Sequence, residues 1–106
     1  MSKQVVARPS QLDRICAILR EHQPMLHKRY GVRSIGIFGS WVRGTQRKKS
    51  DIDILVEIED ETITLFQFAE LREYLQDLLG IRVDLVEKNS LKPRISHHVL
   101  QEVVTI

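Results

Sequence analysis

Asp51 and Asp53 stand one residue apart in the stretch "SDIDILVE", which otherwise has the apolar residues of a buried strand. An unpaired carboxylate in apolar surroundings costs several kcal/mol. On a strand, residues i and i+2 point to the same side, with Cα atoms about 6.5 Å apart. We therefore expect the two carboxylates to converge above one face of a sheet, where they repel each other unless a cation compensates them.

A third acidic residue, Asp84, lies in "VDLVE", which also has the pattern of a strand. If this strand neighbours that of Asp53, all three carboxylates converge. Proteins bind Mg²⁺ through one or two carboxylates, and waters and substrate phosphates complete its octahedron. Such a triad suits phosphoryl transfer on two metal ions about 3.5–4 Å apart. The predicted metal ligands and catalytic residues are Asp51, Asp53 and Asp84.

The pair Gly39-Ser40 follows the apolar run that ends at Phe38. Glycine would let a phosphate approach the backbone, and the serine hydroxyl and the N–H groups of a helix starting near Trp41 would donate to it. A cluster of cations lies between this pair and the aspartates, and it would neutralise the charge of a triphosphate. The predicted nucleotide-binding residues are Gly39, Ser40, Arg43, Lys48 and Lys49, with Arg47 beside them.

Each of these features also has an ordinary structural explanation. A Gly-Ser pair commonly ends a strand, and a run of cations is usually a solvated loop. Arg43 could equally pair with Glu57 or Glu59 on the surface, and Trp41 could pack against the first helix rather than stack on a base. Taken singly, none of the features decides between the two interpretations.

The composition is that of a globular protein, with 42% hydrophobic and 28% charged residues and a net charge of +2. The 106 residues predict one domain over 1–106. The charge excludes a general polyanion binder, so we expect no direct nucleic-acid binding. No apolar stretch is long enough for a membrane span and no signal peptide is recognisable, which predicts a cytoplasmic protein without membrane contact. The sole cysteine, Cys16, is expected to be a buried structural thiol.

Hydrophobic periodicity predicts the elements that position these residues. The first half has a helix from Gln11 to His22, a helical turn or segment between Pro24 and Gly31, and two strands, "VRSIGIFGS" and "SDIDILVEIE". In the first strand, Gly36 permits close backbone approach. The second places four aliphatic residues on one face and Asp51, Asp53, Leu55 and Glu57 on the other.

The second half begins with the helix "TLFQFAELREYLQDLLG", which Gly80 ends, and continues with the strand "IRVDLVE". A last helix follows Pro93, and the final "VVTI" is compatible with a short strand or a helix end. The order α, β, β, α, β, α predicts an α/β or α+β fold, in which a small mixed sheet is flanked by helices.

The combination of motifs resembles a known family. Gly39-Ser40, ten residues, and then Asp51-x-Asp53 in a strand resembles the nucleotidyltransferase superfamily, which includes DNA polymerase beta, poly(A) polymerases and kanamycin nucleotidyltransferase. The fuller pattern, "GSWVRGTQRKKSDIDILVE" followed by "VDLVEKNSLKPRI", is similar to the minimal nucleotidyltransferases, which are stand-alone domains of about this length. The resemblance extends from Phe38 to the C-terminus.

This resemblance implies a polymerase beta-like palm fold, Mg²⁺ on the aspartates and ATP as the donor. It further implies transfer of AMP to a hydroxyl, a tyrosine, of a HEPN ribonuclease toxin, so that the chain would be the antitoxin of a type VII-like toxin–antitoxin pair. Two alternatives stay open: an antitoxin that neutralises its toxin by binding alone, and a small-molecule nucleotidyltransferase of the antibiotic-modifying type. A homodimer is also compatible with the resemblance.

Overall fold

A computed structural model describes residues 10–59 and 63–106 of the chain. Its sheet has the order β3-β2-β1-β4. β1 runs antiparallel to both β2 and β4, whereas β2 runs parallel to β3. The strands are β1 (Val32–Phe38), β2 (Ile52–Ile58), β3 (Val83–Glu87) and β4 (Val104–Thr105). The expectation of a small mixed sheet is confirmed.

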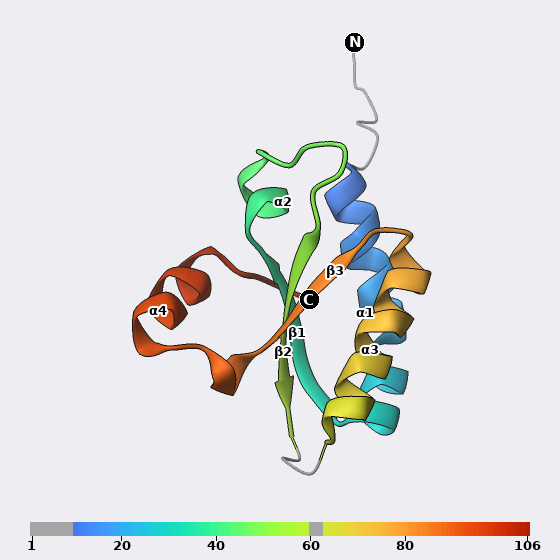
Figure 1. The fold of residues 1–106 in the computed structure, drawn as a ribbon. Coiled ribbons are helices and arrows are strands. Elements are labelled where there is room, and N and C mark those ends of the chain that lie inside the picture. Colours follow the sequence, from blue (N-terminus) through green and yellow to red (C-terminus); the bar gives the residue numbers. More distant parts are fainter. Residues whose placement is uncertain (1–9, 60–62) are drawn as a thin grey trace.

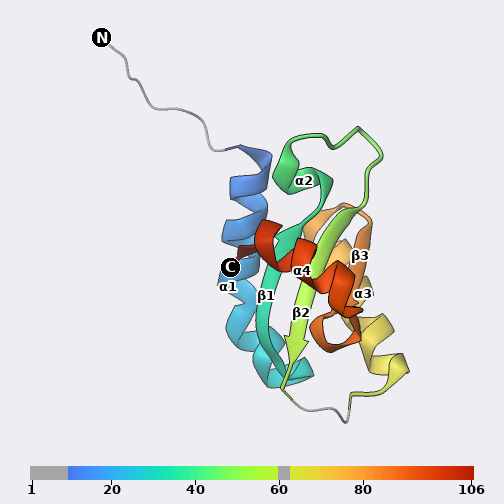
Figure 2. The same ribbon diagram turned by 90° about the vertical axis from the view of Figure 1, so that its left-hand side faces the viewer.

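Helices cover both faces of this sheet. They are α1 (Gln11–Tyr30), α2 (Ser40–Arg43), α3 (Leu65–Leu79) and α4 (Pro93–Glu102), and a 3-10 turn at Lys88–Ser90 follows β3. Figure 1 shows α1 and α3 together on one face, α4 on the opposite face, and α2 at one end of the sheet. In the rotated view of Figure 2, α4 lies across β1 and β2.

The core lies between the sheet and the layer formed by α1 and α3. The apolar face of β2 is buried, as its alternation predicts, and it packs with leucines from both helices. These residues are Ile52, Ile54, Val56 and Ile58 of β2, Leu19 and Leu26 of α1, and Leu71 and Leu75 of α3. Because side chains alternate along a strand, Asp53 and Glu57 point to the other face, the one that α4 covers.

The first helix is longer than its sequence predicts. We expected it to end at His22, but α1 continues through Pro24 to Tyr30 and ends at Gly31, whose φ is 72°. Proline in a helix interior removes one backbone hydrogen bond. The residues beyond it compensate, because Leu26 and Tyr30 are buried against the core.

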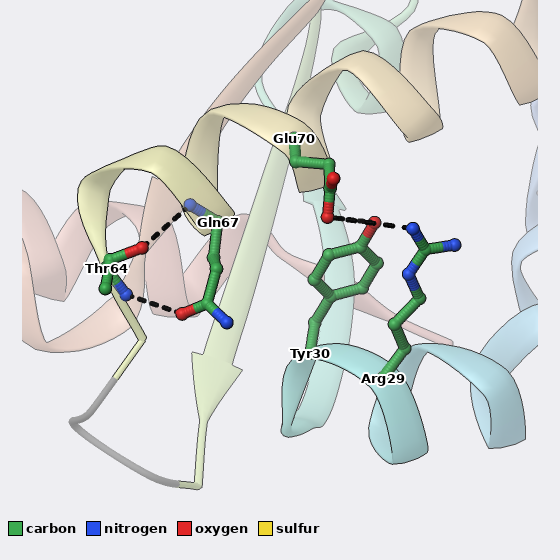
Figure 3. Close-up of polar contacts among 5 residues, drawn as sticks. All are labelled: Arg29, Tyr30, Thr64, Gln67 and Glu70. Carbon is green, nitrogen blue, oxygen red and sulfur yellow. Dashed lines mark hydrogen bonds and ion pairs between the residues drawn. The ribbon is translucent and has the colours of Figure 1, made fainter.

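Polar contacts cap the start of α3 and join this helix to the end of α1 (Figure 3). Thr64 and Gln67 form a capping box at the start of α3, with hydrogen bonds of 2.9 and 3.0 Å. The Tyr30 hydroxyl donates to Glu70 at 3.2 Å, and Arg29 lies 3.7 Å from the same carboxylate. These contacts fix the helix layer against which β2 and β3 pack.

The last residues form a strand, which decides between the two interpretations of "VVTI". α4 ends at Glu102, and β4 then pairs with β1, with Gly36 opposite Thr105 and Ile37 opposite Val104. A Cβ on Gly36 would lie 2.6 Å from Cγ2 of Val103. The expected role of Gly36 is thus confirmed, because its missing side chain lets the end of the chain approach β1.

Cys16 on α1 is partly buried beside the core rather than fully buried. Desolvation raises the pKa of its thiol above the usual value, and the nearby Arg20 only partly offsets this. The thiol is therefore a packing group with little thiolate character. Among the described residues, no helix has the length and apolar character needed to cross a bilayer.

Candidate active site

Asp53 and Asp84 face each other across the parallel pair β2 and β3. Their Cα atoms are register partners, as are those of Ile52 with Val83 and Ile54 with Leu85. The flanking aliphatic residues are buried on the side of α1 and α3. Both carboxylates therefore stand on the opposite face of the sheet, as expected if the two strands are neighbours.

The electrostatic consequence is a perturbed carboxyl at Asp53. Burial raises its pKa from 3.8 to about 6, and the charge of Asp84, a hydrogen bond with Asp84 and the charge of Asp51 add to the rise. Arg43 acts in the opposite direction. The site thus has more negative charge than its nearest cation neutralises.

Asp51 lies at the edge of this pair. It is exposed and directly precedes β2, which begins at Ile52, so the expectation that it belongs to the strand is off by one residue. Its Oδ1 lies 3.9 Å from Nε of Arg82. Within residues 10–59 and 63–106, the side chains as they stand form no ready-made group of three metal ligands. The assembled part of the predicted triad is the pair Asp53 and Asp84.

The chemistry of these donors fits a divalent cation. Carboxylate oxygens are the ligands that Mg²⁺ prefers. A carboxyl whose pKa is raised by burial and by neighbouring anions is stabilised in its ionised form by an added positive charge. The contact of Asp51 with Arg82 is solvent-exposed, and exposed ion pairs of this kind are weak. It therefore presents only a small obstacle to Asp51 joining the other two aspartates around a metal.

Gly39 lies between β1 and α2 with φ 80° and ψ −153°, a backbone conformation open almost only to glycine. A Cβ at this position would overlap Oδ2 of Asp53 and lie 2.9 Å from its Cγ. The close approach that we expected at Gly39 therefore exists, but here the neighbour is the Asp53 carboxylate. Ser40 is the first residue of α2, one position earlier than predicted.

Arg43 does not pair with Glu57 or Glu59, so that alternative is wrong. Glu57 and Glu59 contact other side chains instead. The guanidinium of Arg43 donates from Nη1 to Oε1 of Glu102 at 2.6 Å. Arg43 thus remains close to the aspartates, with its charge shared between them and Glu102.

The basic loop after α2 lies around a different hollow. Arg47, Lys48 and Lys49 line an open pocket of about 600 Å³ together with Arg82 and Trp41. The residues that line this pocket include none of the three aspartates, and neither Gly39 nor Ser40. Trp41 is 7% exposed and belongs to the core, which confirms packing rather than base stacking. A role of Lys48 and Lys49 in nucleotide binding stays a prediction.

Glu102 is a site residue that the sequence patterns did not indicate. Its Oε2 accepts the Gly39 N–H at 2.9 Å, while its Oε1 accepts from Arg43. The hydrogen bond from Gly39 is the main cause that lowers the pKa of this carboxyl; burial offsets part of the effect, and Arg43 lowers the pKa further. If the β1–β4 register continued for two residues beyond Ile37 and Val104, it would set Glu102 opposite Gly39. The position of Glu102 follows from the pairing of β4 with β1, which the local pattern of "VVTI" leaves open.

Comparison with known proteins defines the class of this fold and site. Residues 17–106 match the nucleotidyltransferase domain family. The chain therefore belongs to that family, and the expected fold class is confirmed.

More specific relatives are the minimal adenylyltransferases. The chain is 54% identical to protein adenylyltransferase MntA of Thermococcus cleftensis over 95 residues, which cover 90% of this chain and 95% of that protein. The expectation of an adenylyltransferase enzyme is thereby confirmed.

Two solved structures have the same fold. One is a toxin–antitoxin complex crystallised with AMP-PNP, with a TM-score of 0.64 and 32% identity, covering 86% of this chain and 68% of that chain. The other is a tri-AMPylated Shewanella oneidensis HEPN toxin in complex with an MNT antitoxin, with a TM-score of 0.57 and 26% identity, covering 90% of this chain and 67% of that chain.

The raised pKa of Asp53 predicts a pH-dependent gain in stability on replacing Asp53 by Asn. Between its ordinary pKa of 3.8 and about 6, the folded state binds more protons than the unfolded state. Asp53 therefore contributes stability that is fully present below pH 3.8 and is lost as the pH rises through about 6. In metal-free buffer, Asp53→Asn should be more stable than the wild type at pH 7 by about 1–2 kcal/mol, after allowance for solvent screening.

Urea unfolding at pH 7 and at pH 3.8 measures this difference, which should be small at the lower pH. Asp77→Asn, on the exposed side of α3, is the matched control and should show no such dependence. A wild type at least as stable as Asp53→Asn at pH 7 would contradict the assignment of Asp53 to a repelling pair.

Proposed function

We propose that this chain is a Mg²⁺-dependent adenylyltransferase that transfers AMP from ATP to a tyrosine hydroxyl of a HEPN-family toxin and thereby acts as the antitoxin. The observation that carries the proposal is the pair Asp53 and Asp84, held together by strand register next to the Gly39 turn. A chain that needed only a binding surface would have no reason to keep two repelling carboxylates on one face.

In the proposed reaction, the acceptor hydroxyl oxygen attacks the α-phosphorus of ATP. A P–O bond to the acceptor forms, the bond between the α-phosphorus and the bridging oxygen to the β-phosphate breaks, and pyrophosphate leaves. The hydroxyl proton goes to a carboxylate of the site, and Asp84 is the exposed member of the pair.

Mg²⁺ would be held by Asp51, Asp53 and Asp84, and when bound it would neutralise the charge that develops on the phosphates. Gly39 and Arg43 lie next to Asp53. The backbone N–H of Gly39, the guanidinium of Arg43 and the hydroxyl of Ser40, the first residue of α2, would bind phosphate oxygens. We assign Lys48 and Lys49 to the outer part of the nucleotide, on the expectation that their loop closes over it.

The relatives support the choice of donor and partner. The similar complexes are named for AMP-PNP, an ATP analogue, and for a HEPN toxin that carries AMP. By transfer to this chain, ATP is the proposed co-substrate, a HEPN protein the proposed partner and the cytoplasm, where ATP is made and used, the proposed location.

Incubation of the chain with labelled ATP, Mg²⁺ and a candidate HEPN-family protein tests this function. We expect intact mass measurement to show the HEPN chain heavier by one or more AMP groups on a tyrosine, and release of pyrophosphate. The Asp51→Asn, Asp53→Asn double variant should remain folded and lose the transfer. A toxin that is neutralised without any mass change would support an antitoxin that acts by binding alone. Labelling of a small molecule in place of the toxin would support a small-molecule nucleotidyltransferase.

The Gly39 turn predicts a ranking of three variants in transfer per folded molecule. Gly39→Ala should lose almost all transfer, because the new Cβ overlaps the Asp53 carboxylate. Ser40→Ala should lose roughly tenfold to a hundredfold in kcat/KM for ATP, the value of one hydrogen bond to a charged group.

Gly80→Ala is the control, since Gly80 also has a positive φ, of 68°, but a Cβ there meets nothing within 4 Å. It should be destabilised yet transfer AMP normally once folded. Equal specific activity of Gly39→Ala and Gly80→Ala would remove the Gly39 turn from the site.

A further inference from the structure

The phosphate-binding donors of the proposed site are already engaged by a carboxylate of the chain itself. The Gly39 N–H donates to Oε2 of Glu102 at 2.9 Å, and Arg43 donates to Oε1 at 2.6 Å. The two oxygens of Glu102 thus hold one backbone N–H and one guanidinium, which is the donor set that an anionic phosphate oxygen would take.

The fold places this carboxylate there through two short elements. β4 pairs with β1 beside Gly36 and Ile37, and α4 ends immediately before it at Glu102. The side chain of Glu102 is 23% exposed and points into the turn rather than into water. A salt bridge whose only role was to hold α4 would not need the Gly39 N–H as well.

We propose that Glu102 is an internal competitor of ATP, whose carboxylate occupies the phosphate donors until the nucleotide displaces it. The inference rests on the proposed function, because it takes Gly39 and Arg43 as ATP-binding groups. Glu102 does not act on the reacting atoms; it sets how readily the triphosphate gains its donors.

The element that carries Glu102 can yield at low cost. Val99 is the buried residue of α4, whereas Ile95 and Leu100 are 50% and 45% exposed. Movement of the last turn of α4 would therefore expose one buried apolar side chain, that of Val99. Phosphate oxygens would replace both bonds to Gly39 and Arg43, and the freed Glu102 would be solvated, so the exchange leaves no donor unpaired.

A competing role would be that Glu102 orients Arg43 for the nucleotide. The two roles predict opposite effects of removing the charge. A competitor weakens ATP binding, so its removal strengthens binding, whereas removal of an orienting group weakens it.

Calorimetric titration of the full chain with Mg²⁺ and AMP-PNP, without a partner, separates the two. Glu102→Gln and Glu102→Ala should bind AMP-PNP at least about tenfold more tightly than the wild type, because the charge-assisted bonds from Gly39 and Arg43 to the carboxylate no longer have to be broken. Glu21→Gln, an exposed glutamate on α1, is the matched control and should bind like the wild type.

Hydrogen–deuterium exchange gives a second readout that altered stability alone would not produce. AMP-PNP should increase exchange in the last turn of wild-type α4, residues 99–102, and should leave that turn unchanged in Glu102→Gln. Equal or weaker binding by the two variants, or no increase in exchange in the wild type, would overturn the inference while the proposed function stands. If neither the wild type nor the variants bind AMP-PNP, the proposed function fails and the inference fails with it.

Discussion

The repulsion between two carboxylates on neighbouring strands is the constraint around which this site is organised. Asp53 and Asp84 are opposite each other because β2 and β3 run parallel in a register that also pairs Ile52 with Val83. Sliding the strands by one residue would separate the acids, but it would also turn the aliphatic residues out of the core. The core therefore imposes the repulsion, which adds to the effect of burial in raising the pKa of Asp53.

The apolar face of β2 provides the energy that holds the pair in place. Ile52, Ile54 and Val56 are fully buried, and burial of each such side chain stabilises the fold by about 1.5–3 kcal/mol. Together they exceed the cost of one partly buried, perturbed carboxyl, which is on the order of a few kcal/mol. The groups around the pair follow from this arrangement: Gly39 leaves room for the Asp53 carboxylate, and Arg43 offsets part of its charge.

The local sequence patterns predict those features that depend on periodicity. The alternation of "SDIDILVE" identified the buried face of β2 and the face of Asp53, and Gly80 marked the end of α3. Features that depend on pairing between distant segments were not predictable. The sequence left open whether the strand of Asp84 neighbours that of Asp53. It also left open whether the last residues form a strand, and the position of Glu102 depends on that strand at Val104–Thr105. Pro24 misled because the burial of Leu26 and Tyr30 beyond it outweighs one lost hydrogen bond.

Direct titration of the Asp53 carboxyl by ¹³C NMR tests the central claim, that the strands hold an anionic pair which a cation relieves. In the metal-free protein, the carboxyl should titrate near 6, as burial and the neighbouring aspartates require. On addition of Mg²⁺ and AMP-PNP, its pKa should fall below that value, because the bound cation favours the ionised form. An Asp53 that titrates near 3.8 without metal, or whose titration does not respond to Mg²⁺ and AMP-PNP, would contradict the claim.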